Sequence, residues 1–143
     1  MPTATNADNI ECNSNPCYGT DDLDVMSNPN NLALTIDGLG VDDLIIGGNG
    51  DDQLWGSEDI IYGNFGRDGV LGGQGNDKID GGDGNDILAG NRENDEISGG
   101  EGDDNIWGDG ETGLFMRYAG SDKLYGGPGN DWIDSSGGQR LQK

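Results

Sequence analysis

One nine-residue pattern recurs along most of this chain and constrains its fold more than any other feature. Residues 72–80 read Gly-Gly-Gln-Gly-Asn-Asp-Lys-Ile-Asp, and residues 81–89 read Gly-Gly-Asp-Gly-Asn-Asp-Ile-Leu-Ala. Both copies follow one rule, Gly-Gly-x-Gly-x-Asp-x-aliphatic-x. Tandem repetition at a short fixed period is the signature of a solenoid, in which each copy packs mainly against its neighbours.

The copies keep a strict frame over the second half of the chain. They begin at Gly63, Gly72, Gly81, Gly90, Gly99, Gly108, Arg117 and Gly126, and the last one ends at Asp134. Each has Asp at its sixth position and an apolar residue at its eighth, except that Gly113 replaces Asp in the copy that begins at Gly108. We therefore predict one regular solenoid with a local irregularity near Gly113.

The earlier copies are less regular. Residues 19–27 keep Asp24 at the sixth position, residues 28–36 keep only the length, and residues 37–45 restore the pattern with Asp42 and Leu44. Ile46 is then one extra residue, residues 47–55 are a good copy, and residues 56–62 are two residues short. We expect a tail and cap at 1–18, degenerate repeats at 19–46, a regular roll at 47–134 and a closing cap or frayed end at 135–143.

The composition sets the conditions under which such a chain can fold. Of 143 residues 29 are glycine, 28 are acidic and 7 are basic, so the formal net charge is -21, and only 31% are hydrophobic. A chain of this kind either stays disordered or folds when a cation neutralises it. The charge argues against a nucleic-acid partner, and no apolar run is long enough for membrane insertion. Residues 1–6 lack the features of a signal peptide.

The expected cap contains both cysteines of the chain, Cys12 and Cys17. They are five residues apart, which permits a disulfide and would suit an oxidising compartment. Two unpaired thiols are the alternative that the sequence leaves open.

Each copy divides into a turn of six residues and a strand of three. Glycines at the second and fourth positions allow backbone angles that other residues rarely adopt, so the chain turns sharply and directs carbonyl oxygens inward. The last three residues alternate out, in and out, so one buried aliphatic side chain per copy suffices for the core. Two copies complete one turn of the solenoid, and copies 18 residues apart stack at a spacing of about 4.8 Å.

Stacking brings the sixth-position carboxylates together without a basic side chain between them. Asp77 and Asp95, for example, would face each other across neighbouring turns. Like charges at this range are costly unless a cation lies among them. Oxygen ligands favour calcium, whereas zinc and copper prefer His or Cys, and this chain has no His and no Cys in its repeats. The structural alternative is that each Asp is only a solvated turn residue.

The pattern closely resembles the nonapeptide of the RTX (repeats-in-toxin, haemolysin-type) calcium-binding family, over about residues 37–134 and more weakly from Gly19. The resemblance implies an all-β fold, a right-handed parallel β-roll (a β-helix or solenoid) with calcium ions between successive Gly/Asp-rich loops. It implies about six to eight Ca²⁺ ions bound by sixth-position carboxylates and turn carbonyls. The metal ligands and turn glycines carried over are Asp42, Asp52, Asp59, Asp68, Asp77, Asp86, Asp95, Asp104, Asp122, Asp131, Gly73, Gly75, Gly82 and Gly84.

The frame places these aspartates in two ladders. One would hold Asp59, Asp77, Asp95 and Asp131 and would be interrupted at Gly113. The other would hold Asp52, Asp68, Asp86, Asp104 and Asp122 without interruption. The shortened copy at 56–62, which lacks the fourth-position Gly, and the copies beside Gly113 depart from the family pattern.

Several ninth-position residues, which face solvent, are apolar. On the side of the uninterrupted ladder they are Trp55, Leu71, Ala89, Trp107 and Tyr125, and Trp132 adds apolar area to the opposite side. Contiguous exposed apolar patches mark interfaces, and Trp and Tyr are common anchors there, so we predict a contact surface. The alternative is that a flat sheet tolerates these side chains without using them.

Together these features predict a calcium-binding extracellular or cell-surface structural protein. It is expected to fold on binding calcium and to self-associate into a homo-oligomer, filament or surface layer. The alternative is an accessory RTX module of a secreted enzyme such as a protease, lipase or polysaccharide epimerase. We expect no catalysis in this chain, because it has neither His nor a Gly-x-Ser-x-Gly motif.

Overall fold

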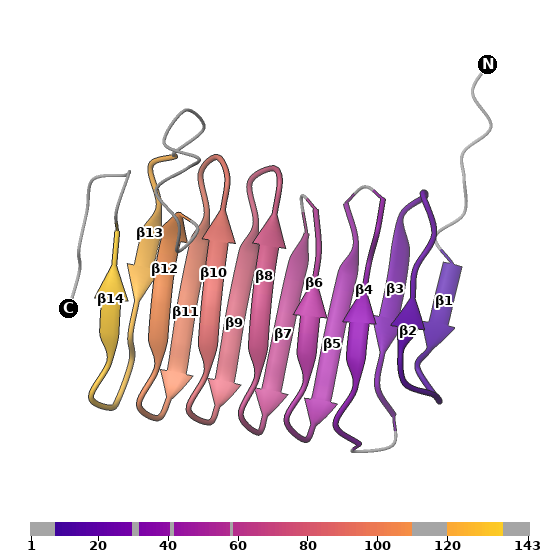
Figure 1. The fold of residues 1–143 in the computed structure, drawn as a ribbon, viewed down its shortest axis with the longest axis horizontal. Helices are drawn as coiled ribbons and strands as arrows, with labels where there is room; N and C mark the ends of the chain where they lie inside the picture. Colours follow the sequence, from indigo (N-terminus) through magenta and orange to yellow (C-terminus); the bar gives the residue numbers. More distant parts are fainter. Residues whose placement is uncertain (1–7, 30–31, 41, 58, 110–119, 136–143) are drawn as a thin grey trace.

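The chain forms two parallel β-sheets that lie face to face as the two sides of a β-solenoid (Figure 1). The structure, a computed structural model, describes residues 8–29, 32–40, 42–57, 59–109 and 120–135. Sheet A has the strand order β1-β3-β5-β7-β9-β11-β13, and sheet B has the order β14-β12-β10-β8-β6-β4-β2. Every neighbouring pair is parallel and the chain alternates between the sheets, which confirms the predicted all-β parallel β-roll.

Strands in the regular copies are longer than the predicted three residues and reach six, because the first residues of the following turn continue the sheet. Sheet A contains β1 Asp8–Glu11, β3 Asp24–Ser27, β5 Leu44–Asn49, β7 Ile60–Phe65, β9 Lys78–Asp83, β11 Glu96–Glu101 and β13 Lys123–Tyr125. Sheet B contains β2 Cys17–Tyr18, β4 Thr35–Asp37, β6 Gln53–Trp55, β8 Gly69–Gly73, β10 Ile87–Asn91, β12 Asn105–Asp109 and β14 Trp132–Asp134. No helix long and apolar enough to cross a membrane occurs within the described ranges.

One aliphatic side chain per copy fills the space between the sheets, as predicted. Each of these side chains is at most 2% exposed, and full burial of such a side chain contributes about 1.5–3 kcal/mol. Sheet A supplies Met26, Ile45, Ile61, Ile79, Ile97 and Leu124, and sheet B supplies Ile36, Leu54, Val70, Leu88 and Ile106.

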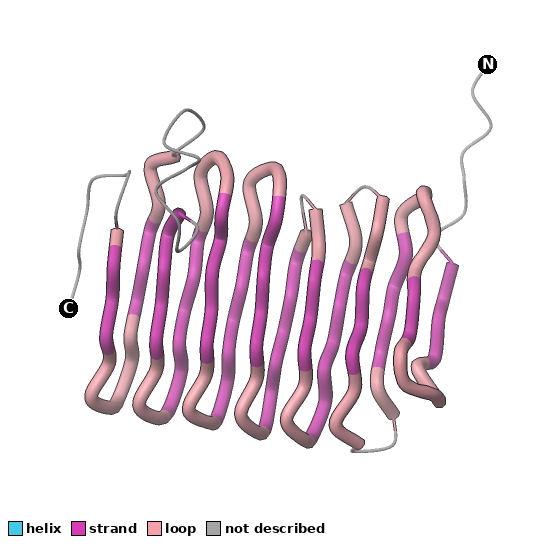
Figure 2. The backbone as a smooth tube through the Cα atoms, viewed as in Figure 1, coloured by secondary structure: helices cyan, strands magenta, loops and turns pink. Residues whose placement is uncertain are grey.

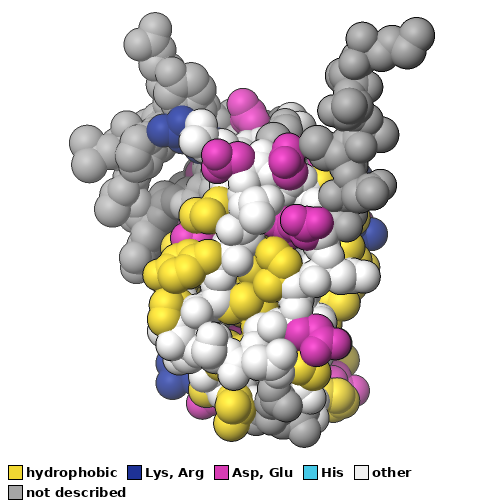
Figure 3. All heavy atoms as spheres, turned by 90° about the vertical axis from the view of Figure 1, so that its right-hand side faces the viewer, with side chains coloured by type: hydrophobic (Ala, Val, Ile, Leu, Met, Phe, Trp, Pro, Cys, Tyr) yellow, Lys and Arg dark blue, Asp and Glu magenta, His cyan; other side chains and the backbone are white. Residues whose placement is uncertain are grey.

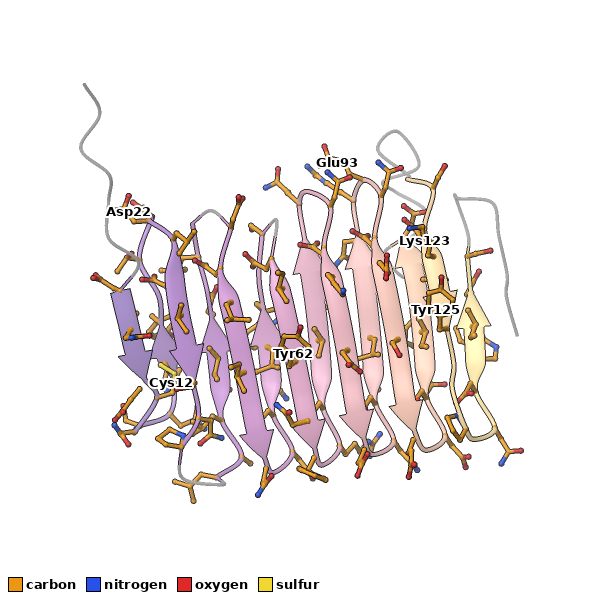
Figure 4. The ribbon with its side chains drawn as sticks, turned by 180° about the vertical axis from the view of Figure 1, so that it is seen from behind. Cys12, Asp22, Tyr62, Glu93, Lys123 and Tyr125 are labelled. Atoms are coloured by element: carbon orange, nitrogen blue, oxygen red, sulfur yellow. A yellow bond between two sulfur atoms is a disulfide. The ribbon has the colours of Figure 1, made fainter. Side chains whose placement is uncertain are left out.

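The N-terminal end of the solenoid is closed by a disulfide between Cys12 and Cys17. Cys12 is 1% exposed and Cys17 is 8% exposed, and both belong to the hydrophobic core (Figure 4). Residues from β1 to β4 continue the same two sheets as the regular copies. Viewed at this end, hydrophobic side chains occupy the middle of the surface with acidic side chains above them (Figure 3).

The structure corrects the predicted frame around Asp42. Asp42 is exposed, whereas Asp43 is 4% exposed and holds the sixth position of its copy. The buried eighth residue is Ile45 rather than Leu44. The sequence did not distinguish the two frames, because two acidic residues are followed by three apolar ones.

The extra residue in this region therefore lies earlier than predicted. Since Asp43 is at the sixth position, its copy begins at Gly38 and ends at Ile46, and the next copy follows directly at Gly47. In the preceding copy Leu34 is 2% exposed, and it holds the place that Asp holds elsewhere.

A second correction concerns residues 108–122. Ile79 pairs with Ile97, 18 residues further along, as in the regular roll. Ile97, however, pairs with Leu124, and Ile106 pairs with Ile133, so both of these pairs span 27 residues. We call one strand with the turn before it a rung of the solenoid. One nonapeptide length between Gly108 and Asp122 thus adds no rung. The predicted irregularity at Gly113 itself falls outside the described residues.

Candidate metal centre

The turns of the solenoid form two rows along its long edges (Figures 1 and 2). The lower turns precede the strands of sheet B and comprise residues 47–52, 63–68, 81–86, 99–104 and 126–131. The upper turns precede the strands of sheet A and comprise residues 19–24, 38–43, 56–59, 72–77, 90–95 and the pair of segments 108–109 and 120–122. These five lower turns have six residues each, whereas the upper turn 56–59 is shorter, so the lower row is the more regular one from residue 47 onward.

An aspartate ends each of these turns, and hydrogen bonds join successive aspartates into ladders. The main-chain N–H of one aspartate donates to Oδ1 of the next along the solenoid, with N···O distances of 2.6–3.1 Å. The upper ladder contains Asp24, Asp43, Asp59, Asp77, Asp95 and Asp122. The lower ladder contains Asp52, Asp68, Asp86, Asp104 and Asp131, with Leu34 before it.

Asp122 and Asp131 lie in the ladders opposite to those predicted. Asp95 N–H donates to Asp122 Oδ1 at 3.0 Å, and Asp104 N–H donates to Asp131 Oδ1 at 3.1 Å. The two aspartates exchange ladders because one nonapeptide length before them adds no rung. Both ladders therefore run without interruption through the described residues.

The second carboxylate oxygen of many ladder aspartates is buried and accepts no hydrogen bond from the part of the chain that the structure describes. A buried charged group left in this state costs more than the roughly 1–3 kcal/mol of a neutral one. These oxygens therefore mark the places at which a cation would be most favourable. They are the Oδ2 atoms of Asp43, Asp68, Asp86, Asp95, Asp104 and Asp122.

Main-chain carbonyl oxygens gather at the same places. A Cβ built on Gly81 would collide with Asp86 Oδ2 and would also lie against the carbonyl oxygen of Gly99 on the next rung. The same two kinds of oxygen meet beside Gly63, where they come from Asp68 and Gly81. Each such place thus holds a carboxylate Oδ2 and a carbonyl oxygen, and no donor among the described residues bonds this Oδ2.

Glycine is required at the four predicted turn positions for two different structural reasons. Gly73, Gly75 and Gly82 have φ of 110°, 104° and 104°, a backbone conformation that L side chains rarely adopt. Gly84 does not have such a φ, but a Cβ there would collide with the carbonyl oxygen of Gly66. Close stacking of the turns therefore requires glycine even where the backbone angle does not.

Three of the predicted metal ligands differ from the rest. Asp42 is exposed, as described above, and Asp131 is only half-buried at the open end of the lower ladder. Asp59 Oδ1 accepts from Asp43 N–H, and its Oδ2 accepts from Ser57 N–H, because the shortened turn brings Ser57 close. Protein donors thus already bond both oxygens of Asp59.

Asp24, which begins the upper ladder, is also partly satisfied by the protein. Its Oδ2 accepts from the N–H of Thr20 at 2.6 Å and from the hydroxyl of Thr20 at 3.1 Å. The first upper turn therefore stabilises its carboxylate with a threonine where the regular copies have a glycine.

Burial raises the pKa values of the ladder carboxyls well above that of a free aspartate. It raises the pKa of Asp86 to about 7 and that of Asp95 to about 8. Neighbouring carboxylates raise both pKa values further, whereas the main-chain hydrogen bonds to the two carboxylates lower them. The pKa values of Asp43, Asp52 and Asp68 are raised to about 6, again mainly by burial. Full ionisation of Asp86 and Asp95 at neutral pH therefore requires compensation by positive charge.

The oxygen atoms present fit calcium. Within the described ranges no three acidic, His or Cys side chains converge on one point, so a cation between two rungs would be held by one or two carboxylates together with carbonyls. Calcium accepts such sets of six to eight oxygens in flexible geometry, whereas magnesium loses its waters reluctantly.

The apolar stripe on the outside of sheet B differs from the prediction at one end. Trp55, Leu71, Ala89 and Trp107 lie in register on neighbouring strands, although Ala89 is itself buried. Tyr125 lies instead on sheet A, where it pairs with Ser98 (Figure 4).

Trp132 contacts the end of this stripe but does not hold the place predicted for Tyr125, because it pairs with Asn105, and Asp134 is in register with Trp107. It lies on sheet B rather than on the opposite side, and its ring centroid is 5.1 Å from that of Trp107. Trp132 is 48% exposed and Leu71 is 42% exposed. The exchange has the same cause as that of Asp122 and Asp131. We call Trp55, Leu71, Trp107 and Trp132 the sheet B stripe.

Comparison with known proteins agrees with this geometry. The model of the RTX calcium-binding nonapeptide repeat matches the chain in four copies, at residues 35–59, 56–79, 80–113 and 118–140. No curated protein and no solved structure matches the chain significantly. The four copies cover more than two thirds of the chain, and RTX repeats bind Ca²⁺. The chain therefore belongs to the RTX calcium-binding nonapeptide repeat family.

Proposed function

We propose that this chain is an extracellular or cell-surface structural module, without catalytic activity, whose β-roll folds when it binds calcium. The pair of buried aspartate ladders carries the proposal. Folding without a cation buries carboxyls whose pKa values rise to about 6–8, and it leaves their Oδ2 atoms without donors. Calcium that binds only the folded chain adds about 2.7 kcal/mol for each site at a hundred times its dissociation constant.

The extracellular location follows from the same dependence. RTX repeats are typical of secreted proteins. A chain with a net charge of -21 would remain unfolded where free calcium is scarce and would fold where it is plentiful. The buried carboxylates are oriented along the ladders rather than into a pocket with a base and a nucleophile, which supports a role without catalysis.

Circular dichroism of the purified chain tests calcium-dependent folding. In chelator we expect the far-ultraviolet spectrum of an unfolded chain, and with calcium we expect a β-sheet spectrum. Magnesium at the same concentration is the matched control and should produce much less β structure. A β spectrum that chelation leaves unchanged would remove the basis of the proposal.

We further propose that the module self-associates through the sheet B stripe, into an oligomer or filament. The stripe combines aromatic and aliphatic side chains, two of which are more than 40% exposed, on an otherwise flat parallel sheet. Burial of such side chains between two copies gains roughly 25 cal/mol per Å² of apolar area. Sheet A also exposes Tyr62 and Tyr125, but Asp80 and Ser98 separate them in the same row, so its aromatic residues form no continuous stripe.

Light scattering in calcium tests this surface. The double variant Trp55→Ser/Trp107→Ser should fold with calcium but associate more weakly than the wild type. Tyr125→Ser, an aromatic substitution on the other sheet, is the control and should associate normally. Equal association of all three proteins would exclude the sheet B stripe as the contact.

A further inference from the structure

Asp109 is a buried carboxylate that belongs to neither ladder. It is the last residue of β12 and the second residue of the upper turn that begins at Gly108. The other regular copies have an uncharged residue at this second position, either Gly, as at Gly73 and Gly82, or Asn, as at Asn64 and Asn91. Asp109 is 9% exposed, so the extra carboxylate is directed into the turn and not toward solvent.

One oxygen of Asp109 is engaged by the protein and the other is not. Oδ1 accepts a hydrogen bond from Gly120 N–H at 3.2 Å. This bond joins the last described residue before the segment 110–119 to the first described residue after it. Oδ2 is buried and accepts no hydrogen bond from the described residues. The hydrogen bond to Gly120 alone therefore does not account for a charged side chain at this place.

Asp122 of the upper ladder lies against the same turn. A Cβ on Gly108, the residue before Asp109, would collide with Asp122 Oδ2, and that oxygen is also buried without a donor. Burial is the main cause of the raised pKa values of Asp122 and of Asp95 on the preceding rung, and the charge of Asp109 raises both further. This turn thus concentrates more buried negative charge than a regular turn does.

We infer that Asp109 supplies a second side-chain carboxylate, beside that of Asp122, to a calcium site at the base of the extra nonapeptide. The inference rests on the proposed calcium-dependent folding, but it assigns a ligand that the nonapeptide pattern does not contain. Main-chain carbonyls would have to complete the site, because no third acidic side chain converges on it in the described residues. Two carboxylates and carbonyls form an all-oxygen set suited to calcium. The bound ion would neutralise Asp109 and hold the upper turn closed between Gly108 and Gly120.

Calcium titration calorimetry of the full chain tests this assignment. Asp109→Asn keeps an oxygen that can accept from Gly120 N–H but removes the charge. We expect this variant to bind one calcium ion fewer than the wild type, or to bind one ion at least tenfold more weakly. Asp83→Asn removes an exposed carboxylate from the regular turn 81–86 and is the control. It should keep the wild-type stoichiometry and affinities within about twofold.

A third variant keeps the test decisive if Asp109→Asn does not fold. Asp109→Glu retains the charge, and it should fold with calcium and bind the wild-type number of ions. Wild-type calcium binding by Asp109→Asn would overturn the inference, as would failure of both variants to fold, since packing rather than charge would then explain Asp109. Absence of calcium binding by the wild type would instead refute the proposed function itself.

Discussion

Replacement of Asp86 by Asn should have opposite effects on the calcium-free and the calcium-bound protein. Asp86 is completely buried in the lower ladder, and its Oδ1 accepts from Asp68 N–H at 2.9 Å. The amide oxygen of Asn can accept the same bond. The amide nitrogen of Asn would replace Oδ2 beside the carbonyl oxygen of Gly99 and could donate a hydrogen bond to it. Asp86 Oδ2, by contrast, has no donor among the described residues.

The size of the calcium-free effect follows from the pKa of Asp86. Burial raises this pKa from 3.8 to about 7. A difference of about three pKa units corresponds to about 4 kcal/mol, at 1.36 kcal/mol per unit. At pH 8 the folded wild type bears this cost for an ionised Asp86, whereas the neutral amide of the Asp86→Asn variant does not incur it. The variant should therefore fold more readily without calcium, yet it loses a charged calcium ligand.

Two titrations at pH 8, both followed by circular dichroism, separate these effects. In chelator, an osmolyte such as trimethylamine N-oxide favours the compact state, and Asp86→Asn should need less of it than the wild type. In calcium, the same variant should need a higher free calcium concentration to reach half its β signal. Asp83→Asn, in the same turn but exposed, should resemble the wild type in both titrations. The reasoning is refuted if Asp86→Asn needs more osmolyte, or if its calcium midpoint is unchanged.

Three further predictions concern protons, glycine and the disulfide. Because the folded-state pKa values of about 6–8 exceed the ordinary 3.8, the folded chain binds more protons than the unfolded chain, and its calcium-free stability should be greatest at acidic pH and decline as pH rises through 6–8. A β signal in chelator that grows from pH 5 to pH 8 would contradict this prediction. Gly84→Ala should destabilise the calcium-bound roll by about 1–3 kcal/mol in thermal unfolding, because the added Cβ collides with the carbonyl oxygen of Gly66. Gly69→Ala is the control and should lower stability less, because no atom lies closer than 3.9 Å to its added Cβ. Loss of the disulfide in Cys12→Ser/Cys17→Ser should lower stability by about 2 kcal/mol in the same assay, and an unchanged unfolding temperature would show that the first rungs do not depend on it.

The regular part of the fold could be predicted because each copy specifies the geometry of its own rung. Glycine at the turn, Asp at its end and one aliphatic residue in the strand determine that geometry locally. The strict copies that contain Val70, Ile79, Leu88 and Ile97 bury those side chains as expected. The disulfide remained open in the sequence, because spacing alone does not show whether Cys12 and Cys17 meet.

The frame near Asp43 could not be settled by local pattern alone. Asp42 and Asp43 are both acidic, and the three residues that follow are all apolar, so either frame places Asp before a buried side chain. The long-range bonds decide, because Asp24 N–H donates to Asp43 Oδ1 and Asp43 N–H donates to Asp59 Oδ1. A signal was present in Gly38, which gives this copy the glycine start of the copy at Gly47.

The exchange between the ladders was hidden because the extra segment has the length of one repeat. A copy of nine residues that adds no rung leaves the sequence in frame but reverses the side to which all later residues belong. For this one reason the observed side of the solenoid is opposite to the predicted side for four residues, Asp122, Asp131, Tyr125 and Trp132. Asp109 was missed for a related reason, since it is read as a variable residue in a poor copy. The available signal was an Asp at the second position, where the other regular copies have Gly or Asn.

Hydrogen exchange at the amides of the ladder aspartates tests the central claim most directly. Each of these N–H groups donates to the Oδ1 of the next aspartate, so its protection reports whether the ladder is assembled around its carboxylates. We predict that the amides of Asp68, Asp77 and Asp86 exchange slowly in calcium and rapidly in chelator at neutral pH. Equal protection in the two conditions would show that the ladders stand without calcium and would contradict the account.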